Sequence, residues 1–173
     1  LSQLDNLNLL NHVDIILVSD HGMTDIDYQE KVIFLDDYIN QDLIPYKIVG
    51  HSPVANIFIE NQYKDEFYNI LSKAHPNISL YANNNVPNYW HCNHHRRSGD
   101  YLLVADEGWS FINKKSQQSS YTYKGNHGFD NRYASMHALF VCGGPSFKDK
   151  QKDIGKPVNN IDIYSLLCHL LNI

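Results

Sequence analysis

The sequence of 173 residues predicts an α/β fold. Short runs of β-branched and other apolar residues, typical of buried strands, alternate with segments whose apolar residues recur at helical spacing. Strands that alternate with helices in this way indicate the α/β class. Hydrophobic residues make up 43% of the chain, a proportion ordinary for globular proteins, which argues against wholesale disorder.

The N-terminal third of the chain opens with a helical pattern and continues with short apolar runs. Leu1, Leu4 and Leu7 recur at helical spacing, which indicates the end of a helix. Residues 13–18 form a nearly continuous β-branched run, which predicts a buried strand of a parallel sheet. Further strands are predicted from similar runs at residues 32–35 and 54–59.

The middle of the chain holds one predicted helix and several strands. The helix covers residues 63–74, because Phe67, Ile70 and Leu71 fall on one face, and Pro76 ends it since proline cannot continue a helix. A polar loop is predicted over residues 82–100, and residues 113–126 are expected to be exposed. The strand patterns in this part are at residues 78–81, 101–105 and 109–112.

The C-terminal part contributes one more strand and a last helix. Residues 138–142 predict a buried strand that ends at the Gly-Gly-Pro sequence of residues 143–145. Asn159 or Asn160 is the predicted cap of the last helix. The apolar residues of this helix follow a helical period: Ile161, Tyr164, Leu167, Leu170 and Leu171.

Charge, hydropathy and cysteine content exclude several classes of protein. The net charge of −5 argues against a generally basic surface, so we expect no nucleic-acid duplex as a partner. No apolar run approaches the roughly 18–20 residues that cross a bilayer, so we expect no membrane-spanning segment in this chain. The three cysteines, Cys92, Cys142 and Cys168, cannot all pair with one another, and no Cys-x-x-Cys is present for a thiolate zinc site.

Asp20-His21-Gly22 is the strongest local signal of chemistry. It directly follows an apolar strand, and ligands of open α/β sheets bind beyond the carboxyl ends of strands. A carboxylate and an imidazole both bind zinc, and Gly22 lets the backbone turn sharply enough for the two to reach one point. The competing interpretation is a turn with an Asp cap and a histidine that is satisfied within the protein.

A second candidate is His127, which stands between Asn126 and Gly128 in a polar loop. Such a histidine resembles a metal ligand on a bare turn, although a lone loop histidine is usually only solvated. The spacing along the chain does not show whether His21 and His127 converge. Residues 91–95 (His-Cys-Asn-His-His) also have a metal-like composition, but neighbouring arginines disfavour a cation there.

Several of these segments together resemble one family. Residues 14–24 contain Ser-Asp-His-Gly-Met and resemble the SDHGM segment of the ectonucleotide pyrophosphatase/phosphodiesterase family, also called type I phosphodiesterases, of the alkaline phosphatase superfamily. Residues 125–131 are similar to its GxHGYDN segment, with Phe129 where tyrosine is usual. Further matches follow the family order, at residues 104–109, 136–147 and 163–171. Residues 86–91 and the C-terminal Cys-His-Leu-Leu-Asn-Ile most resemble the subgroup that contains the family's fifth member.

The resemblance implies an alkaline-phosphatase-like α/β fold with two zinc ions per complete domain. Asp20 and His21 would bind the zinc that activates the nucleophile, and His127 would bind the other zinc. In the family, the remaining ligands and the nucleophilic threonine lie upstream, and this sequence has no counterpart for them. We therefore expect residues 1–173 to be the C-terminal portion of a single phosphodiesterase catalytic domain, and to be inactive alone.

The activity that the resemblance implies is zinc-dependent hydrolysis of phosphodiester and pyrophosphate bonds in extracellular nucleotides, such as NAD, ATP and dinucleotide polyphosphates. The route would pass through a nucleotidyl-threonine intermediate. Two alternatives stay open: a choline-phosphodiester or lysophospholipid phosphodiesterase, and a catalytically weak ectodomain used for adhesion or signalling. Members of the family are secreted or are anchored with the domain outside the cell, so we expect an extracellular location, with any anchor outside this chain. Asn77 begins a glycosylation sequon, Asn77-Ile78-Ser79, which is compatible with secretion.

Overall fold

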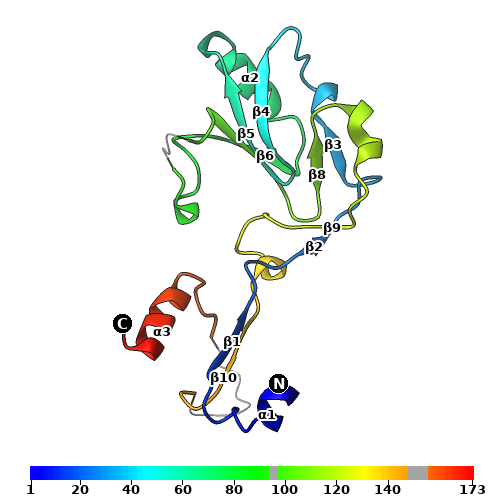
Figure 1. Cartoon of the computed structure of the whole chain (residues 1–173). Helices are drawn as coiled ribbons and strands as arrows, with labels where there is room; N and C mark the ends of the chain where they lie inside the picture. The colour runs from blue at the N-terminus through cyan, green and yellow to red at the C-terminus, as the bar shows by residue number, and fades with distance from the viewer. Residues whose placement is uncertain (94–96, 148–155) are drawn as a thin grey trace. The chain divides into compact units, whose positions relative to one another are not determined.

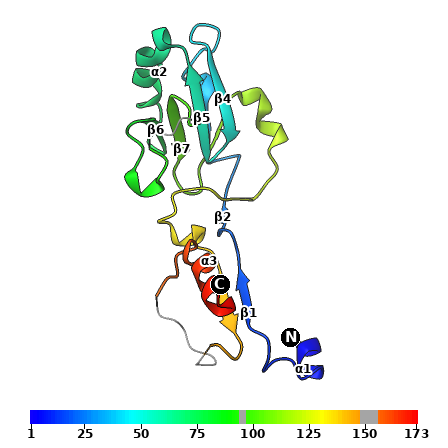
Figure 2. The same cartoon turned by 60° about the vertical axis from the view of Figure 1, so that its left-hand side comes forward.

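The computed structural model describes residues 1–93, 97–147 and 156–173. The chain divides into two compact units, each described here by itself. The terminal unit combines the two ends of the chain, residues 1–22 and 137–173, and the central unit consists of residues 23–136. Figure 1 labels most helices and strands of both units, and Figure 2 also labels β7.

The central unit is built on an antiparallel four-stranded sheet in the order β4-β5-β7-β6. Its strands are β4 (Tyr46–His51), β5 (Val54–Ile59), β6 (Ile78–Ala82) and β7 (Tyr101–Ala105). The register places Ala55 of β5 and Leu80 of β6 opposite Leu103 of β7. Because side chains alternate along a strand, these three residues share one face of the sheet.

That face carries the main core of the central unit. Helix α2 (Lys64–Leu71) lies against the sheet and contributes Phe67 and Leu71, which are almost fully buried (Figure 2). The ring of Phe67 contacts the rings of Tyr46 and Tyr101, with centroids 5.1 and 5.8 Å apart. The apolar face expected for this helix is therefore the face that packs on the sheet.

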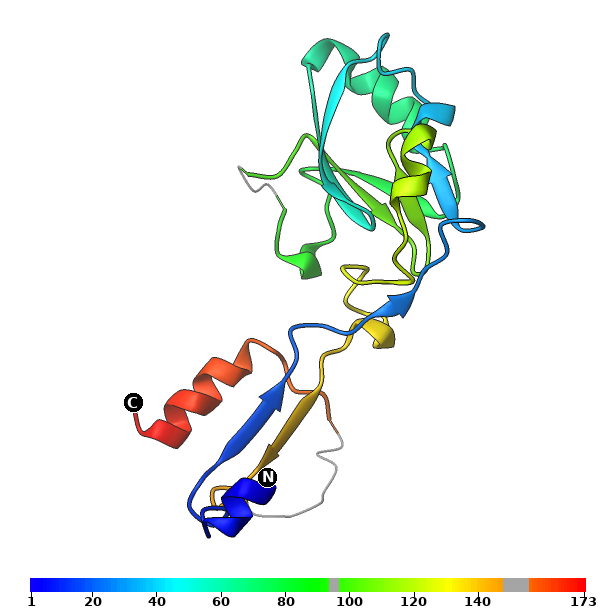
Figure 3. The same ribbon diagram turned by 45° about the vertical axis from the view of Figure 1, so that its right-hand side comes forward.

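Shorter elements complete the central unit. β3 (Val32–Phe34) pairs in parallel with β8 (Ser110–Ile112), and β2 (Thr24–Asp25) pairs antiparallel with β9 (Gly125–Asn126) (Figure 3). Five 3₁₀-helices lie among the described residues: η1 (Leu35–Asp37), η2 (Asn61–Tyr63), η3 (Asn88–Trp90), η4 (Lys115–Ser120) and η5 (Ala134–Met136).

The terminal unit is an antiparallel ribbon flanked by helices. β1 (Ile15–Val18) pairs with β10 (Phe140–Gly143), and the helices are α1 (Ser2–Asn6) and α3 (Asp162–Leu171). Side-chain hydrogen bonds connect the two strands at both ends of the ribbon. The Asp14 carboxylate accepts from the backbone N–H and the hydroxyl of Ser146, at 3.0 and 2.6 Å. At the other end, the Ser19 Oγ accepts from the Leu139 N–H at 2.8 Å.

The mixture of helices and strands confirms the predicted α/β class, and most predicted elements are present within a few residues of their expected bounds. Two strand predictions are wrong in detail. The run at residues 13–18 is an antiparallel strand, not a parallel one, and Leu17 and Val18 are 56% and 43% exposed. The run at residues 138–142 is also only half-buried, with Val141 50% exposed. Within the described residues these two strands form a ribbon of their own, so their exposure is that of residues 1–173 alone.

The predicted cap of the last helix is also wrong. Helix α3 begins at Asp162, Ile161 is its cap residue, and no side chain caps it by a hydrogen bond. The Asn159 side chain instead donates to the Asp162 carboxylate at 3.1 Å. β4 was not predicted, because Lys47, Gly50 and His51 interrupt the apolar pattern of that segment.

No helix in the described part of the chain has the length and apolar character needed to cross a membrane.

Candidate functional site

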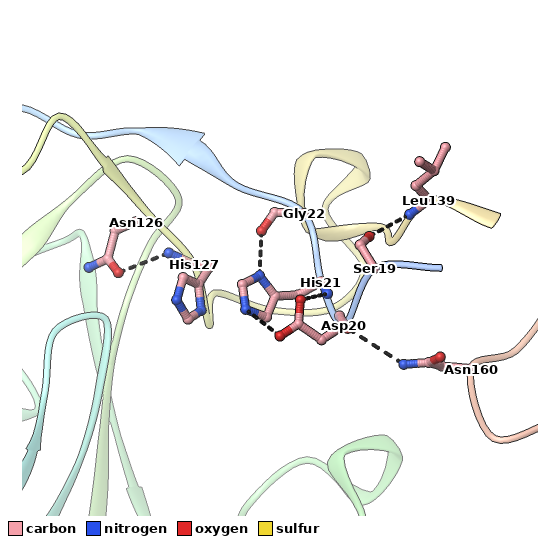
Figure 4. A network of polar contacts seen from close by, with 8 residues as sticks. All are labelled: Ser19, Asp20, His21, Gly22, Asn126, His127, Leu139 and Asn160. Carbon is pink, nitrogen blue, oxygen red and sulfur yellow. Dashed lines mark hydrogen bonds and ion pairs between the residues drawn. The ribbon is translucent and has the colours of Figure 1, made fainter. Parts of the chain in front are cut away.

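Asp20 and His21 lie directly after β1 in the terminal unit, where the sequence pattern placed them. The Asp20 side chain is 85% exposed and the His21 side chain 36%. Neither side chain is buried in the core, so both are accessible to a ligand from solvent. The backbone before them is held by the contact between Ser19 and Leu139, and the Asn160 side chain donates to the Asp20 carbonyl oxygen at 3.5 Å (Figure 4).

The His21 ring is oriented by the next residue along the chain. Its Nδ1 atom lies 2.8 Å from the carbonyl oxygen of Gly22 (Figure 4). A carbonyl oxygen only accepts, so Nδ1 carries the hydrogen and donates. Metal-binding histidines commonly donate one ring N–H in this way and bind the metal through the other ring nitrogen, which in His21 is Nε2.

The two side chains fit a zinc ion in both atom type and spacing. His21 Nε2 lies 3.4 Å from Asp20 Oδ2. Two ligand atoms about 2.0–2.2 Å from a tetrahedral zinc are themselves about 3.3–3.6 Å apart. The other carboxylate oxygen, Asp20 Oδ1, accepts from the His21 backbone N–H at 3.0 Å, which fixes the carboxylate relative to the ring.

His127 lies in the central unit, immediately after β9. Its backbone N–H donates to the Asn126 Oδ1 at 2.9 Å, and the Asn126 amide donates to the Ser52 carbonyl oxygen at 2.9 Å. The His127 side chain is exposed, whereas Phe129, two residues further, is only 5% exposed. The loop is thus anchored on both sides of an exposed histidine. Sequence reasoning missed Asn126, although an asparagine beside a glycine is a common turn signal.

A second anchor of this loop is Asp130. The Arg132 guanidinium donates to both of its carboxylate oxygens, at 3.1 and 2.9 Å, and the Tyr89 hydroxyl donates to it as well. Partial burial by itself raises the pKa of the Asp130 carboxyl, but the donors from Arg132 and Tyr89 outweigh it and hold this pKa below its usual range. The carboxylate therefore stays ionised and ties the His127 loop to η3.

The structure brings Asp20 and His21 together in the terminal unit, and it places His127 in the other unit. Within residues 1–93, 97–147 and 156–173, no three side chains of His, Cys, Asp or Glu are grouped closely enough to hold a metal ion. Of the alternative metal cluster at residues 91–95, His94 and His95 lie outside the described residues.

Asn77, the predicted glycosylation site, precedes β6 and is half-buried. Its side-chain amide donates to the Asp106 carboxylate at 3.2 Å, and its carbonyl oxygen accepts from the Asp106 backbone N–H at 2.9 Å. The cysteines Cys92, Cys142 and Cys168 are not paired with one another.

The fold and the motifs define this chain as part of an alkaline-phosphatase-like α/β domain. It belongs to the type I phosphodiesterase/nucleotide pyrophosphatase family, whose model matches residues 1–130. The family resemblance inferred from the SDHGM and GxHG segments is therefore confirmed.

Individual relatives agree with this assignment. The chain is 40% identical to ectonucleotide pyrophosphatase/phosphodiesterase family member 5 of Homo sapiens, over all of this chain and 35% of that protein. It is 35% identical to a bis(5'-adenosyl)-triphosphatase of Xenopus laevis, over all of this chain and 36% of that protein. The chain thus spans about a third of the length of these relatives.

Solved structures show the same likeness. The structure of human family member 5 matches with a TM-score of 0.87 and 39% identity, over 99% of this chain and 44% of that one. An inactive threonine-to-alanine variant of murine family member 5, in complex with AMP, matches with a TM-score of 0.86 and 40% identity, again over 99% of this chain and 44% of that one.

Proposed function

We propose that the complete protein containing this chain hydrolyses phosphodiester and pyrophosphate bonds of nucleotides, with NAD, ATP and dinucleotide polyphosphates as substrates. The observation that carries the proposal is the 3.4 Å spacing of His21 Nε2 and Asp20 Oδ2, in a chain that belongs to a phosphodiesterase family. The names of the relatives and the AMP complex of one of them support a nucleotide as substrate.

Two zinc ions per complete domain are part of this proposal. Asp20 and His21 would hold one ion and His127 the other, with the remaining ligands supplied from outside residues 1–173. When bound, zinc would neutralise the negative charge that develops on the phosphoryl oxygens. The donor set, a carboxylate and an imidazole, is one that zinc accepts.

The roles of this chain's own residues are to bind and to position. Gly22 holds the His21 proton on Nδ1, and the His21 N–H orients the Asp20 carboxylate. Asn126 and Asp130 hold the loop that presents His127. These contacts keep the ligand atoms in place without movement during the reaction, which is how prearranged charge lowers a barrier.

The bond-making group is proposed to be a threonine outside this chain. Its hydroxyl oxygen would attack the phosphorus of the nucleotide, and the bond from phosphorus to the leaving-group oxygen would break. Water would then release the nucleotide from the threonine. The inactive threonine-to-alanine variant among the related structures supports this assignment. It follows that residues 1–173 alone are inactive.

An extracellular location, secreted or at the cell surface, is a further proposal. It is supported by the "ectonucleotide" names of relatives and by the Asn77-Ile78-Ser79 sequon. A glycosidase-sensitive mass shift that disappears in Asn77→Gln protein would test the sequon. A shift that persists in Asn77→Gln protein would place the glycan elsewhere, and secreted protein with no shift at all would remove the sequon as support for this location.

The activity itself is tested by incubating the complete protein with ATP, diadenosine triphosphate, NAD and a choline phosphodiester, and separating the products by chromatography. We expect AMP from the nucleotides, and loss of this product when a chelator is added. Cleavage of the choline ester alone would favour the lipid-directed alternative. Folded protein that cleaves none of the four would favour the non-catalytic ectodomain.

A further inference from the structure

The outer face of the four-stranded sheet, opposite the main core, mixes polar residues such as Asn56 and Ser79 with apolar residues of β5 and β7. In β5 and β7 the core-facing residues alternate with residues on the opposite face, among them Val54 paired with Val104. Val104 is only 7% exposed and Val86 only 4%, yet both lie outside the main core cluster. Valines on a solvated sheet face would be more exposed, so the part of the outer face around Val104 is covered by other segments.

Two segments of the central unit cover this part of the face. One is the Val86–His91 stretch with η3, and the other is the loop that follows His127. Between them and the sheet lies a pocket of about 480 Å³. Its walls include Val86, Tyr89, Trp90, Leu102, Phe129 and Asp130. Small-molecule sites have volumes of about 300–1,000 Å³, so this pocket has room for a nucleoside-sized group.

The aromatic walls of the pocket are held in place by their neighbours. The Trp90 ring contacts the rings of Tyr81 and Tyr89 at 5.4 and 5.7 Å, both in edge-to-face geometry. Tyr89 is fixed in turn by its hydrogen bond to Asp130 and by the Arg132 guanidinium 4.6 Å from its ring centroid. Rings that neighbours already hold lose little freedom when they stack on a ligand.

The polarity of the pocket selects the class of ligand. Its carboxylate, Asp130, is already paired with Arg132, and its other polar side chains are uncharged amides, a thiol and a hydroxyl together with the imidazole of His91: Asn56, Asn83, Asn131, Cys92 and Ser98. Apolar and aromatic walls with a few amides suit an uncharged, flat heterocycle with hydrogen-bonding edges. They do not suit a phosphate group, which needs several cationic or N–H donors.

The pocket adjoins the candidate metal ligand through the chain itself. Gly128 and Phe129, which line it, directly follow His127. We propose that the Val86–His91 stretch, the loop after His127 and the outer face of β5 and β7 form a subsite for the nucleobase of the leaving group of a dinucleotide substrate. This inference rests on the proposed function, because it assigns the pocket to the leaving group of the proposed hydrolysis.

The test compares two substrates of the complete protein that release the same AMP but differ in the leaving group. Diadenosine triphosphate carries a second adenosine there, and ATP does not. Trp90→Ala is expected to lower the ratio of kcat/KM for diadenosine triphosphate to that for ATP by about 5- to 150-fold, the range that base–aromatic stacking accounts for. Trp90→Phe, which keeps a flat ring, is expected to restore most of the ratio.

A second variant guards against a simple folding defect. Leu102→Trp fills the pocket instead of opening it, and we expect it to lower the same ratio. Tyr38→Ala is the matched control, because Tyr38 is a partly exposed aromatic residue of the same unit that does not line the pocket. Thermal unfolding of each variant verifies that it is folded.

The outcomes separate this inference from the proposed function. Wild-type protein that cleaves neither substrate contradicts the proposed function. Wild-type protein that cleaves both, with an unchanged ratio in folded Trp90→Ala and Leu102→Trp, overturns the subsite alone. A structure of the complete protein with the pocket filled by its own side chains would also overturn it.

Discussion

The Nε2 atom of His21 lies 3.4 Å from the Oδ2 atom of Asp20, while the opposite ring nitrogen is held by a carbonyl oxygen of the backbone. Two ligand atoms at the spacing of a tetrahedral zinc thus come from adjacent residues, at the end of a strand. The backbone of Gly22 fixes the tautomer, so the pair needs no further side chain to hold it ready for a cation.

The first prediction concerns His21. In the complete protein, His21→Ala is expected to lower the rate of nucleotide hydrolysis by more than about 100-fold. Mutation of a residue that only hydrogen-bonds to a metal ligand already lowers metal affinity or activity by about 10- to 100-fold, and His21 is proposed to be a ligand itself. The measurement is AMP release from ATP at fixed zinc concentration. His12→Ala is the control, because His12 is an exposed histidine of the same unit. Equal activities in the two variants would contradict the assignment.

The second prediction concerns His127 and is measured without activity. If His127 binds one of two zinc ions, purified His127→Ala protein should contain about one zinc per chain, where the wild-type protein contains two. Elemental analysis after dialysis against metal-free buffer gives this number. Loss of both ions would mean that the two sites are coupled, and an unchanged zinc content would remove His127 from the site.

The sequence predicted β5, β6 and β7 of the central sheet but not β4, because a strand that is covered on one face shows the periodicity on which such predictions depend. Ala55 and Ile57 of β5 are buried and alternate with less buried residues, as an amphipathic strand requires. In contrast, the continuous apolar run of β1 predicted burial on both faces, which a two-stranded ribbon does not provide. A pattern of residue types reports how much apolar surface a segment carries, not which segment covers it.

The sequence likewise predicts the candidate ligands of the site but not the residues that position them. Asp20, His21 and His127 stand out because their residue types and glycine neighbours form short motifs in the sequence. The residues that hold them in place do not stand out. Ser52 contacts Asn126 from 74 positions away, and Tyr89 contacts Asp130 from 41 positions away. Contacts of this separation depend on the tertiary fold and leave no local pattern.

A third prediction concerns stability at acid pH. The Asp100 carboxylate pairs with Lys64 at 2.7 Å and accepts from the Ile59 N–H at 2.9 Å. Burial raises the pKa of this carboxyl, but those donors outweigh it and lower the pKa overall. The pair therefore adds stability above the unfolded pKa of about 3.9, and this contribution is lost as the pH falls from there through the folded pKa.

Asp100→Asn is expected to lower the melting temperature at pH 7 and to weaken its fall between about pH 4 and pH 2, compared with the wild-type protein. Asp37→Asn, at an exposed position, serves as the control. Melting temperatures measured across this pH range test both expectations. A mutant curve that runs parallel to the wild-type curve would show that Asp100 is not the group responsible.

A fourth prediction compares two adjacent glycines at the end of β10. Gly144 has φ +135°, and a Cβ atom there would lie 2.5 Å from the Asp14 Oδ1 and 2.6 Å from the Val13 carbonyl oxygen. Gly143 has open space around it. Gly144→Ala should therefore lower the free energy of unfolding by at least about 1–3 kcal/mol, whereas Gly143→Ala should have little effect. Denaturant unfolding of both variants gives these free energies. Similar values for Gly144→Ala and Gly143→Ala would contradict the prediction that only position 144 requires glycine.

The last prediction concerns residues 1–173 expressed alone, which we expect to release no AMP from ATP even with added zinc. Asp20 and His21 offer one zinc ion two ligands and His127 offers the other ion one, so neither site reaches four-coordination from this chain. The ribbon also leaves Leu17, Val141 and the α3 residue Tyr164 half or more exposed, an apolar surface that favours aggregation. The complete protein should be more soluble and active, and its activity should be lost with a chelator. AMP release by the purified segment alone, abolished by the chelator, would overturn the prediction and would place the attacking hydroxyl among the serines and threonines of this chain.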